Sequence, residues 1–176
     1  MIGVLRPGAR AACATGAERI GVLATQGTVS SGAYERAVRE ADKGISVHQV
    51  ACPLFVPLVE AGSTEGLEAA EACREALTPL AGKPACDAII LGCTHYPFLL
   101  PELRRAAAML FENQPIFVDP AQETARTVAD TLRAVGIARQ SDTRPLHRYF
   151  ASADPDQFRL HAPRLLGADV PEVEQG

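Results

Sequence analysis

Short apolar runs alternate with longer amphipathic or polar stretches along most of the chain. Four runs that are apolar or β-branched predict strands, and most are followed by a segment with helical periodicity. These runs cover residues 19–25, 45–50, 87–92 and 115–119. The third is apolar almost throughout, which is typical of a strand that is covered on both faces. The alternation predicts an α/β fold with a largely parallel sheet.

The helical periodicity predicts helices over residues 33–41, 58–80 (interrupted near Gly62) and 98–110. A fourth begins after Asp119, which is predicted to cap it, with Pro120 at its first position and a glutamine three residues after the cap. One face of this helix is apolar: Ala125, Val128, Ala129, Leu132 and Val135. A last strand at 146–152 and a helix at 155–166 are predicted, and the polar tail from residue 168 is expected to fray.

Three segments follow predicted strands and therefore meet at the carboxyl edge of the sheet: residues 25–31, 51–57 and 92–97. Ligands of open parallel sheets bind beyond this edge. We therefore expect a shared pocket there, whatever its chemistry.

Composition limits the classes of function. The chain has 176 residues, enough for one domain or two small ones, and its net charge of −4 gives no footprint for nucleic acid. No apolar stretch reaches the length of a membrane span, and without a charged-then-apolar leader at Met1 we do not expect secretion. Five cysteines without a C-x-x-C pair argue against a disulfide framework and for the cytoplasm. Neither of the two lysines suggests a pyridoxal Schiff base.

The stretch "LGCTHYPFL" places Cys93 and His95 at the end of the third strand. They fit a buried structural thiol beside a satisfied histidine, two ligands of a metal site, a hydrolytic nucleophile, or a thiol that acts as acid and base. No second ligand pair supports a metal. An adjacent imidazole and the helix that follows both favour a thiolate. Cys52 and Cys73 are interpreted as small buried hydrophobes.

Two further sets of residues have both a functional and a structural interpretation. The stretch "ATQGTVSSGAY" offers Thr25, Thr28 and Ser31 ahead of a helix, which suits a carboxylate or phosphate but equally a capped turn. It lacks the lysine of a phosphate-binding loop and the spacing of a dinucleotide fingerprint. Glu60 follows an apolar loop and is either partly buried in the site or an ordinary surface glutamate.

Five segments together resemble the glutamate racemases, in the same order as in that family. They are "GVLRPGA", "IGVLATQGTVSSGAYERAV", "ACPLFVPLVEAG", "LGCTHYPFL" and "FVDPAQETA". The resemblance implies an isomerase without cofactor or metal, which interconverts L- and D-glutamate for peptidoglycan synthesis and cell shape. Its partner is the small-molecule substrate, without nucleic acid or membrane, and a homo-oligomer is left open. A racemase for another acidic amino acid such as aspartate is the alternative within the same class.

The resemblance also assigns roles. The family uses two thiols on opposite faces of the substrate carbon, and Cys93 matches the second, which acts on L-glutamate. Thr94 and His95 match substrate-binding positions, with His95 also tuning or reprotonating the thiol. Glu60 matches an acidic residue of that half of the site. Substrate binding is further implied for three hydroxyls: Thr25, Thr28 and Ser31.

The sequence departs from the family at its beginning. Relatives have roughly ninety further residues there, a domain-sized region with D-S-G, P-Y-G and C-N-T motifs that do not occur here. The family's three-layer α/β fold has two lobes, so residues 14–121 are expected to form one complete lobe, with 1–13 and 122–176 a remnant of the other. The tail should then expose Leu146, Tyr149 and Phe150. With one thiol, the chain is expected to racemise poorly, and a truncated, non-catalytic remnant is the other alternative.

Overall fold

The computed structural model describes residues 1–141, 143, 145–167, 170 and 172–176. The chain folds as two compact units, Met1–Ala138 and Arg139–Gly176. Each unit is described by itself.

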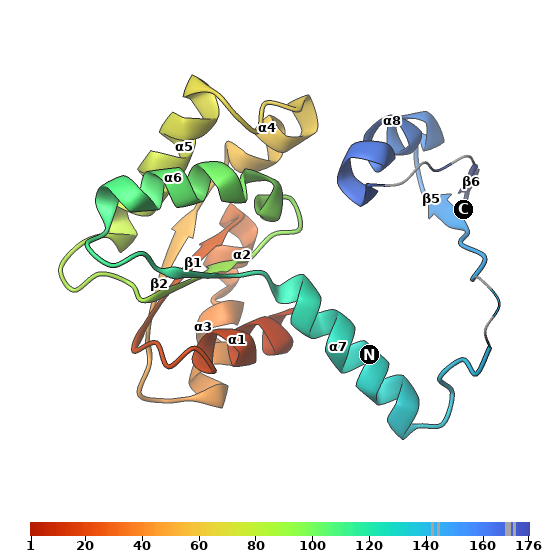
Figure 1. Cartoon of the computed structure of the whole chain (residues 1–176), viewed down its shortest axis with the longest axis horizontal. Helices are drawn as coiled ribbons and strands as arrows, with labels where there is room; N and C mark the ends of the chain where they lie inside the picture. Colours follow the sequence, from red (N-terminus) through yellow and green to blue (C-terminus); the bar gives the residue numbers. More distant parts are fainter. Residues whose placement is uncertain (142, 144, 168–169, 171) are drawn as a thin grey trace. The chain divides into compact units, whose positions relative to one another are not determined.

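The first unit is built on a four-stranded parallel sheet (Figure 1). Its strands are β1 (Arg19–Ala24), β2 (Ser46–Ala51), β3 (Ala88–Leu91) and β4 (Ile116–Val118), in the spatial order β2-β1-β3-β4. β1 pairs with both β2 and β3, and β4 pairs with β3. The predicted α/β class and parallel sheet are confirmed.

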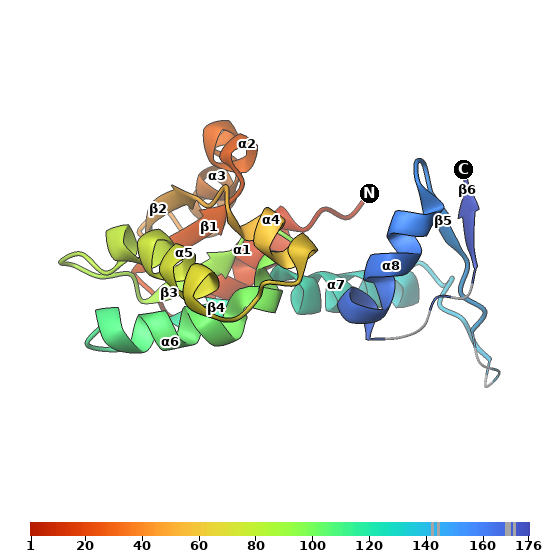
Figure 2. The same ribbon diagram turned by 90° about the horizontal axis from the view of Figure 1, so that it is seen from above.

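Helices cover both faces of this sheet, which gives three layers (Figures 1 and 2). α1 and α3 lie on one face, and α5 and α6 lie on the other. The helices of the unit are α1 (Leu5–Cys13), α2 (Gln26–Ser31), α3 (Ala33–Ala41), α4 (Phe55–Ala61), α5 (Leu67–Leu77), α6 (Leu100–Leu110) and α7 (Pro120–Ala134), with 3₁₀ turns η1 (Thr78–Leu80) and η2 (Tyr96–Leu99).

Alternate residues of the central strands enter two different cores. Ile20, Val22 and Ile90 are fully buried in a cluster that includes residues of α1 and α3. The intervening positions face the opposite layer: a Cβ on Gly21 would lie 2.7 Å from Leu80 Cδ1. Burial on both sides explains why these strands are apolar throughout rather than alternating.

Three segments differ from the prediction. Residues 26–31 form the short helix α2, which the pattern did not predict, and the Thr25 side chain caps it by accepting a hydrogen bond from the Thr28 backbone N–H. The predicted helix 58–80 starts earlier, at Phe55, whereas its predicted interruption near Gly62 is confirmed, because Gly62, with a φ of 79°, ends α4. Residues 5–13 form α1, which the pattern missed because Pro7 and Gly8 lie inside it.

α7 begins as predicted and then leaves the core. Asp119 Oδ1 accepts the Ala121 N–H at 2.9 Å, which confirms the cap. Pro120 is buried, and a Cβ on Gly8 of α1 would lie 2.9 Å from it, so the first turn of α7 packs closely on α1. The predicted apolar face is exposed further along: Val135 is 59% accessible. Helical periodicity identified the face but not whether anything covers it.

The second unit contains β5 (Tyr149–Ala151), α8 (Pro155–Leu166) and β6 (Val173–Gln175). The helix is confirmed, and Leu146 and Phe150 are exposed as expected, whereas Tyr149 is half-buried, with its ring 6.1 Å from that of Phe158. The prediction of a frayed tail is wrong for residues 173–175, because β6 pairs with β5 in parallel. Residues 168, 169 and 171 of that tail lie outside the described residues.

The predicted two-lobe division stays a prediction. Residues 1–13, assigned by the resemblance to the other lobe, belong here to the same compact unit as the sheet, and that unit continues to residue 138. Among the described helices, none combines the length and apolar character that crossing a membrane requires.

Candidate active site

The polar groups of interest lie just beyond the carboxyl ends of β1, β2 and β3. Thr25 follows β1, Cys52 follows β2, and Gly92 and Cys93 follow β3. Because the three strands are adjacent and parallel, these ends meet at one edge of the sheet. The sequence predicted this edge correctly.

Gly92 fixes the point at which the chain leaves β3. Its N–H donates to the Leu23 carbonyl at 2.8 Å, continuing the ladder with β1. A Cβ here would lie 2.9 Å from that carbonyl oxygen and 2.9 Å from Cε2 of Tyr34. Only glycine fits this approach without displacing backbone, and the next residue, Cys93, is thereby held at the edge.

Cys93, His95 and Glu60 form a chain of polar contacts. The Cys93 Sγ lies 3.9 Å from His95 Nδ1, and His95 Nε2 lies 3.5 Å from Glu60 Oε1. The histidine side chain is 26% exposed and the glutamate 57% exposed, so the chain runs from a partly covered thiol out to solvent. The structure brings together all three residues predicted to be catalytic.

The contacts indicate how the imidazole is used. A carboxylate only accepts hydrogen bonds, so Glu60 favours a proton on Nε2 of His95. In the neutral ring Nδ1 is then an acceptor, able to receive a proton from the Cys93 thiol. The Thr94 hydroxyl lies 3.4 Å from the same nitrogen and is a second donor to it. This arrangement suits a thiol that gives up and regains a proton.

A buried tyrosine connects the two segments that carry this chain. The Tyr96 hydroxyl donates to the Cys52 carbonyl at 3.1 Å. Its ring meets the Phe55 ring edge-on, with centroids 4.9 Å apart and planes at 73°. Phe55 begins α4, the helix that carries Glu60, so Tyr96 ties that helix to the segment that carries His95.

The predicted hydroxyl residues form a local network at α2. The Thr25 and Thr28 Oγ1 atoms lie 3.0 Å apart, and the exposed Ser31 hydroxyl donates to the Thr28 carbonyl at 2.7 Å. Within the described part of the chain, no hydrogen bond connects them to Cys93 or His95. The structure thus supports the capped-turn interpretation and leaves their substrate-binding role a prediction.

Cys93 and Thr94 also line a cavity of about 340 Å³. Tyr34 and Asp119 line it as well, and sequence reasoning did not propose either for the site. Burial, followed by the nearby Cys93 and Asp119, raises the pKa of Tyr34 to about 12. Tyr34 has the sequence setting of a helical core residue, and Asp119 that of a helix cap, so nothing in the pattern distinguished them.

The other thiols lie in different environments. Cys52 and Cys73 are buried as predicted, and burial raises the pKa of each to about 12. Cys93 and Cys13 are the partly exposed ones, and all five cysteines are free. Among the described residues, no cluster of three or more His, Cys, Asp or Glu is arranged to hold a metal ion.

Comparison with known proteins decides the family. The family described as Asp/Glu/Hydantoin racemase matches residues 1–128. The chain belongs to this racemase family. It is 39% identical to the glutamate racemase of Geobacter metallireducens over 176 residues, which cover 99% of this chain and 63% of that protein.

Two solved racemase structures share the fold. Glutamate racemase isoform RacE1 from Bacillus anthracis superposes with a TM-score of 0.89 at 35% identity, covering 99% of this chain and 64% of that one. The Francisella tularensis glutamate racemase, solved with D-glutamate, has a TM-score of 0.88 at 24% identity over 99% of this chain and 63% of that one, and shows the fold alone. The chain spans 57% to 65% of the length of the curated racemases that it matches.

Proposed function

We propose that this chain carries one catalytic half of a cofactor-independent glutamate racemase. The observation that supports it is the contact chain from Cys93 through His95 to Glu60 at the carboxyl edge of the sheet. Family membership and 39% identity to a glutamate racemase support glutamate as the substrate. The product, D-glutamate, would serve peptidoglycan synthesis, in a cytoplasm that keeps these free thiols reduced.

The chemistry is a proton transfer at the substrate α-carbon. The Cys93 thiolate takes the α-proton of L-glutamate, which leaves a thiol and a carbanion delocalised into the adjacent carboxylate. His95 then exchanges the thiol proton with solvent, with Glu60 holding the proton on its far nitrogen. The thiol returns a proton to the same face. A single thiol therefore exchanges the α-proton with retention, whereas racemisation needs a second base on the opposite face.

Incubating the full chain with L-glutamate in heavy water tests this proposal. We expect deuterium at the α-carbon, measured by NMR, with little D-glutamate in chiral chromatography. Exchange should fall at least about 100-fold in Cys93→Ser and about 10-fold or more in His95→Gln, in the range of general acid–base effects. Cys13→Ser, which removes the other partly exposed thiol, is the matched control and should exchange normally.

Each alternative outcome is informative. D-glutamate formed as fast as deuterium enters would mean that a second base lies within these residues, and the one-base interpretation would be wrong. No exchange would favour a non-catalytic remnant, and exchange that survives Cys93→Ser would contradict the catalytic role of Cys93. L-Aspartate, run in parallel, tests the alternative acidic substrate.

A further inference from the structure

The cavity beside Cys93 has a lining that does not match glutamate. Its walls are mainly apolar, with Val4, Leu91 and Phe98 among them. Its described lining residues include no lysine, arginine or histidine, and they do include Asp119. Glutamate brings two carboxylates, and burying an anion beside another anion without a cation is unfavourable. A different class of molecule fits this space.

Tyr34 places a hydrogen-bond donor in the cavity wall. Its side chain is 1% exposed and lines the cavity, yet its hydroxyl makes no hydrogen bond to any residue the structure describes. With its pKa raised to about 12, the phenol keeps its proton at neutral pH. The hydroxyl is not one of the fully buried polar atoms that lack a partner, so water in the cavity reaches it, and an occupant that offers an acceptor can replace that water. The ring is packed against Gly92, which makes the wall preformed.

Asp119 supplies the complementary acceptor from a different element. Its Oδ1 accepts the Ala121 N–H at the start of α7, and Asp119 is one of the residues that line the cavity. A carboxylate has four lone-pair sites, so one backbone N–H leaves capacity for a donor on an occupant. The same charge repels anions. Donor and acceptor thus sit on α3 and at the start of α7, on the wall of one apolar cavity.

We propose that this cavity is a binding site for an uncharged, ring-sized small molecule whose hydroxyl accepts from Tyr34 and donates to Asp119, and that its occupant covers Cys93. The volume is at the lower end of the range for small-molecule pockets, which suits a single ring rather than a nucleotide. The proposal does not rest on the racemase function.

Three fluorinated probes test the ligand class on the full chain by ¹⁹F NMR titration. 4-Fluorophenol has the ring and the hydroxyl, fluorobenzene lacks the hydroxyl, and 4-fluorobenzoate carries a negative charge. We expect saturable binding of the phenol, with the other two at least about tenfold weaker, the effect of one well-placed hydrogen bond. Equal binding of all three, or no saturable binding of the phenol at millimolar concentration, would overturn the proposal.

Variants locate the site. Tyr34→Phe keeps the ring and should weaken the phenol about tenfold while leaving fluorobenzene unchanged. Tyr96→Phe removes the same atom from a buried tyrosine that does not line the cavity, and should leave all three probes unchanged. Asp119→Asn keeps a capping oxygen without the charge and should admit the benzoate. Phenol affinity that survives Tyr34→Phe, in a protein with an unchanged melting curve, would contradict the assignment.

Alkylation of the thiols gives a second readout. Saturating 4-fluorophenol should slow iodoacetamide modification of Cys93 at least about fivefold, because the occupant covers it, and leave Cys13 unchanged. Equal rates at Cys93 with and without the phenol would contradict the placement. Because neither readout requires glutamate, their failure is distinguishable from failure of the deuterium exchange that tests the proposed function.

Discussion

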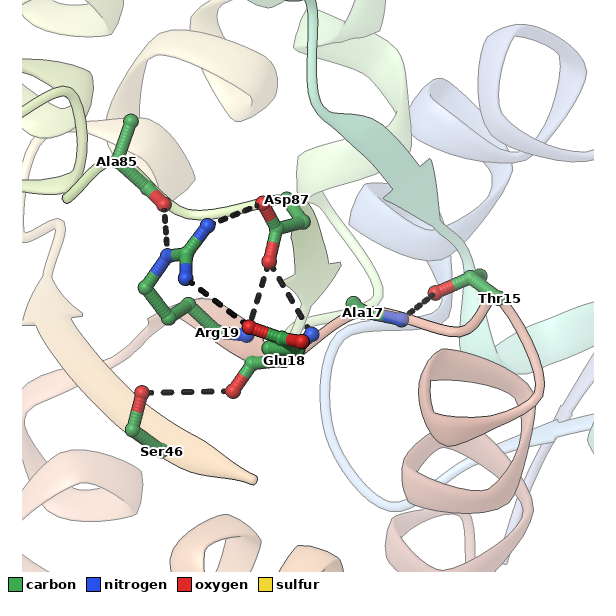
Figure 3. A network of polar contacts seen from close by, with 7 residues as sticks. All are labelled: Thr15, Ala17, Glu18, Arg19, Ser46, Ala85 and Asp87. Carbon is green, nitrogen blue, oxygen red and sulfur yellow. Dashed lines mark hydrogen bonds and ion pairs between the residues drawn. The ribbon is translucent and has the colours of Figure 1, made fainter. Parts of the chain in front are cut away.

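The polar groups at the two ends of the four-stranded sheet differ in how completely they are hydrogen-bonded. At the amino end, Asp87 accepts the backbone N–H groups of Glu18 and Arg19 at 3.1 and 3.0 Å and the Arg19 guanidinium at 2.8 Å (Figure 3). Arg19 Nε donates to the Ala85 carbonyl at 2.6 Å. At the carboxyl end, the Cys93–His95 contact is 3.9 Å long and the Tyr34 hydroxyl has no acceptor among the described residues.

This difference is what we expect if the polar groups at the amino end serve the fold and those at the carboxyl end serve the proposed chemistry. Groups that close a fold gain most when every donor and acceptor is paired, as around Asp87. Groups that act on a substrate need spare capacity, which costs stability and has to be held by neighbours. Gly92 and Tyr96 provide that support at the carboxyl end. Variants at the two ends should therefore fail differently.

Asp87→Ala is expected to give the largest loss of stability. It leaves two backbone N–H groups and a guanidinium without their acceptor, which should lower the free energy of unfolding by about 3 kcal/mol in urea titrations. Ser46→Ala removes a 3.5 Å bond at the same edge and should cost far less. Native-state alkylation of Cys93 should stay within about twofold of wild type. If Asp87→Ala also changed the rate of Cys93 alkylation well beyond twofold, the two ends of the sheet would not be independent.

Gly92→Ala should cost less stability but disturb the chemistry. The added Cβ meets a backbone oxygen and the Tyr34 ring at 2.9 Å, so we expect a loss of about 2 kcal/mol and a several-fold change in Cys93 alkylation. Gly27→Ala in α2 meets nothing within 4 Å and is the control, expected to be neutral or slightly stabilising. If Gly92→Ala changed neither quantity, the close approach would not be what holds Cys93.

High pH should lower the free energy of unfolding through buried thiols at both ends of the sheet. We expect this loss to be smaller than that caused by either substitution above. Burial raises the pKa of Cys52, at the carboxyl end, to about 12, and that of Cys86, before β3, to about 11, with Asp87 adding to the Cys86 shift and Arg19 opposing it. A raised pKa stabilises the fold below the ordinary thiol value of 9.0, and this stability is lost as pH rises through the folded-state value.

We expect about 1 kcal/mol of loss per thiol at pH 10, measured by denaturant titration at pH 7.5 and 10. Either Cys52→Ala or Cys86→Ala should flatten the decline by that amount. An unchanged slope in both variants would mean that other groups cause it.

Most of the fold followed from local pattern. Strands 19–25 and 87–92 were predictable because a parallel strand covered on both faces is a continuous apolar run. The cap at Asp119 followed from side-chain chemistry within three residues. The pattern did not predict α1, because Pro7 and Gly8 interrupt its helical periodicity. Gly8 is needed because Pro120, far along the chain, would lie 2.9 Å from a Cβ at this position.

The residues of the candidate site also fall into those that the sequence predicts and those that only the structure identifies. Cys93, His95 and Glu60 were named from residue type, position and resemblance, and the structure brings them together. Tyr34 lines the same cavity as Cys93 and Asp119, and only the tertiary structure brings these three residues to one place. Thr25, Thr28 and Ser31 have local partners, which residue types alone left open.

By itself the sequence determined the α/β class, the edge of the sheet that carries the candidate site and the family resemblance. These depend on periodicity, capping and motifs, all of which act within a few residues of one another. Only the tertiary structure decided which polar groups are paired and which are left available. Asp87 meets Arg19, and Tyr34 meets Gly92, because strands and helices far apart in the chain pack side by side, and burial then sets the cost of every missing hydrogen bond.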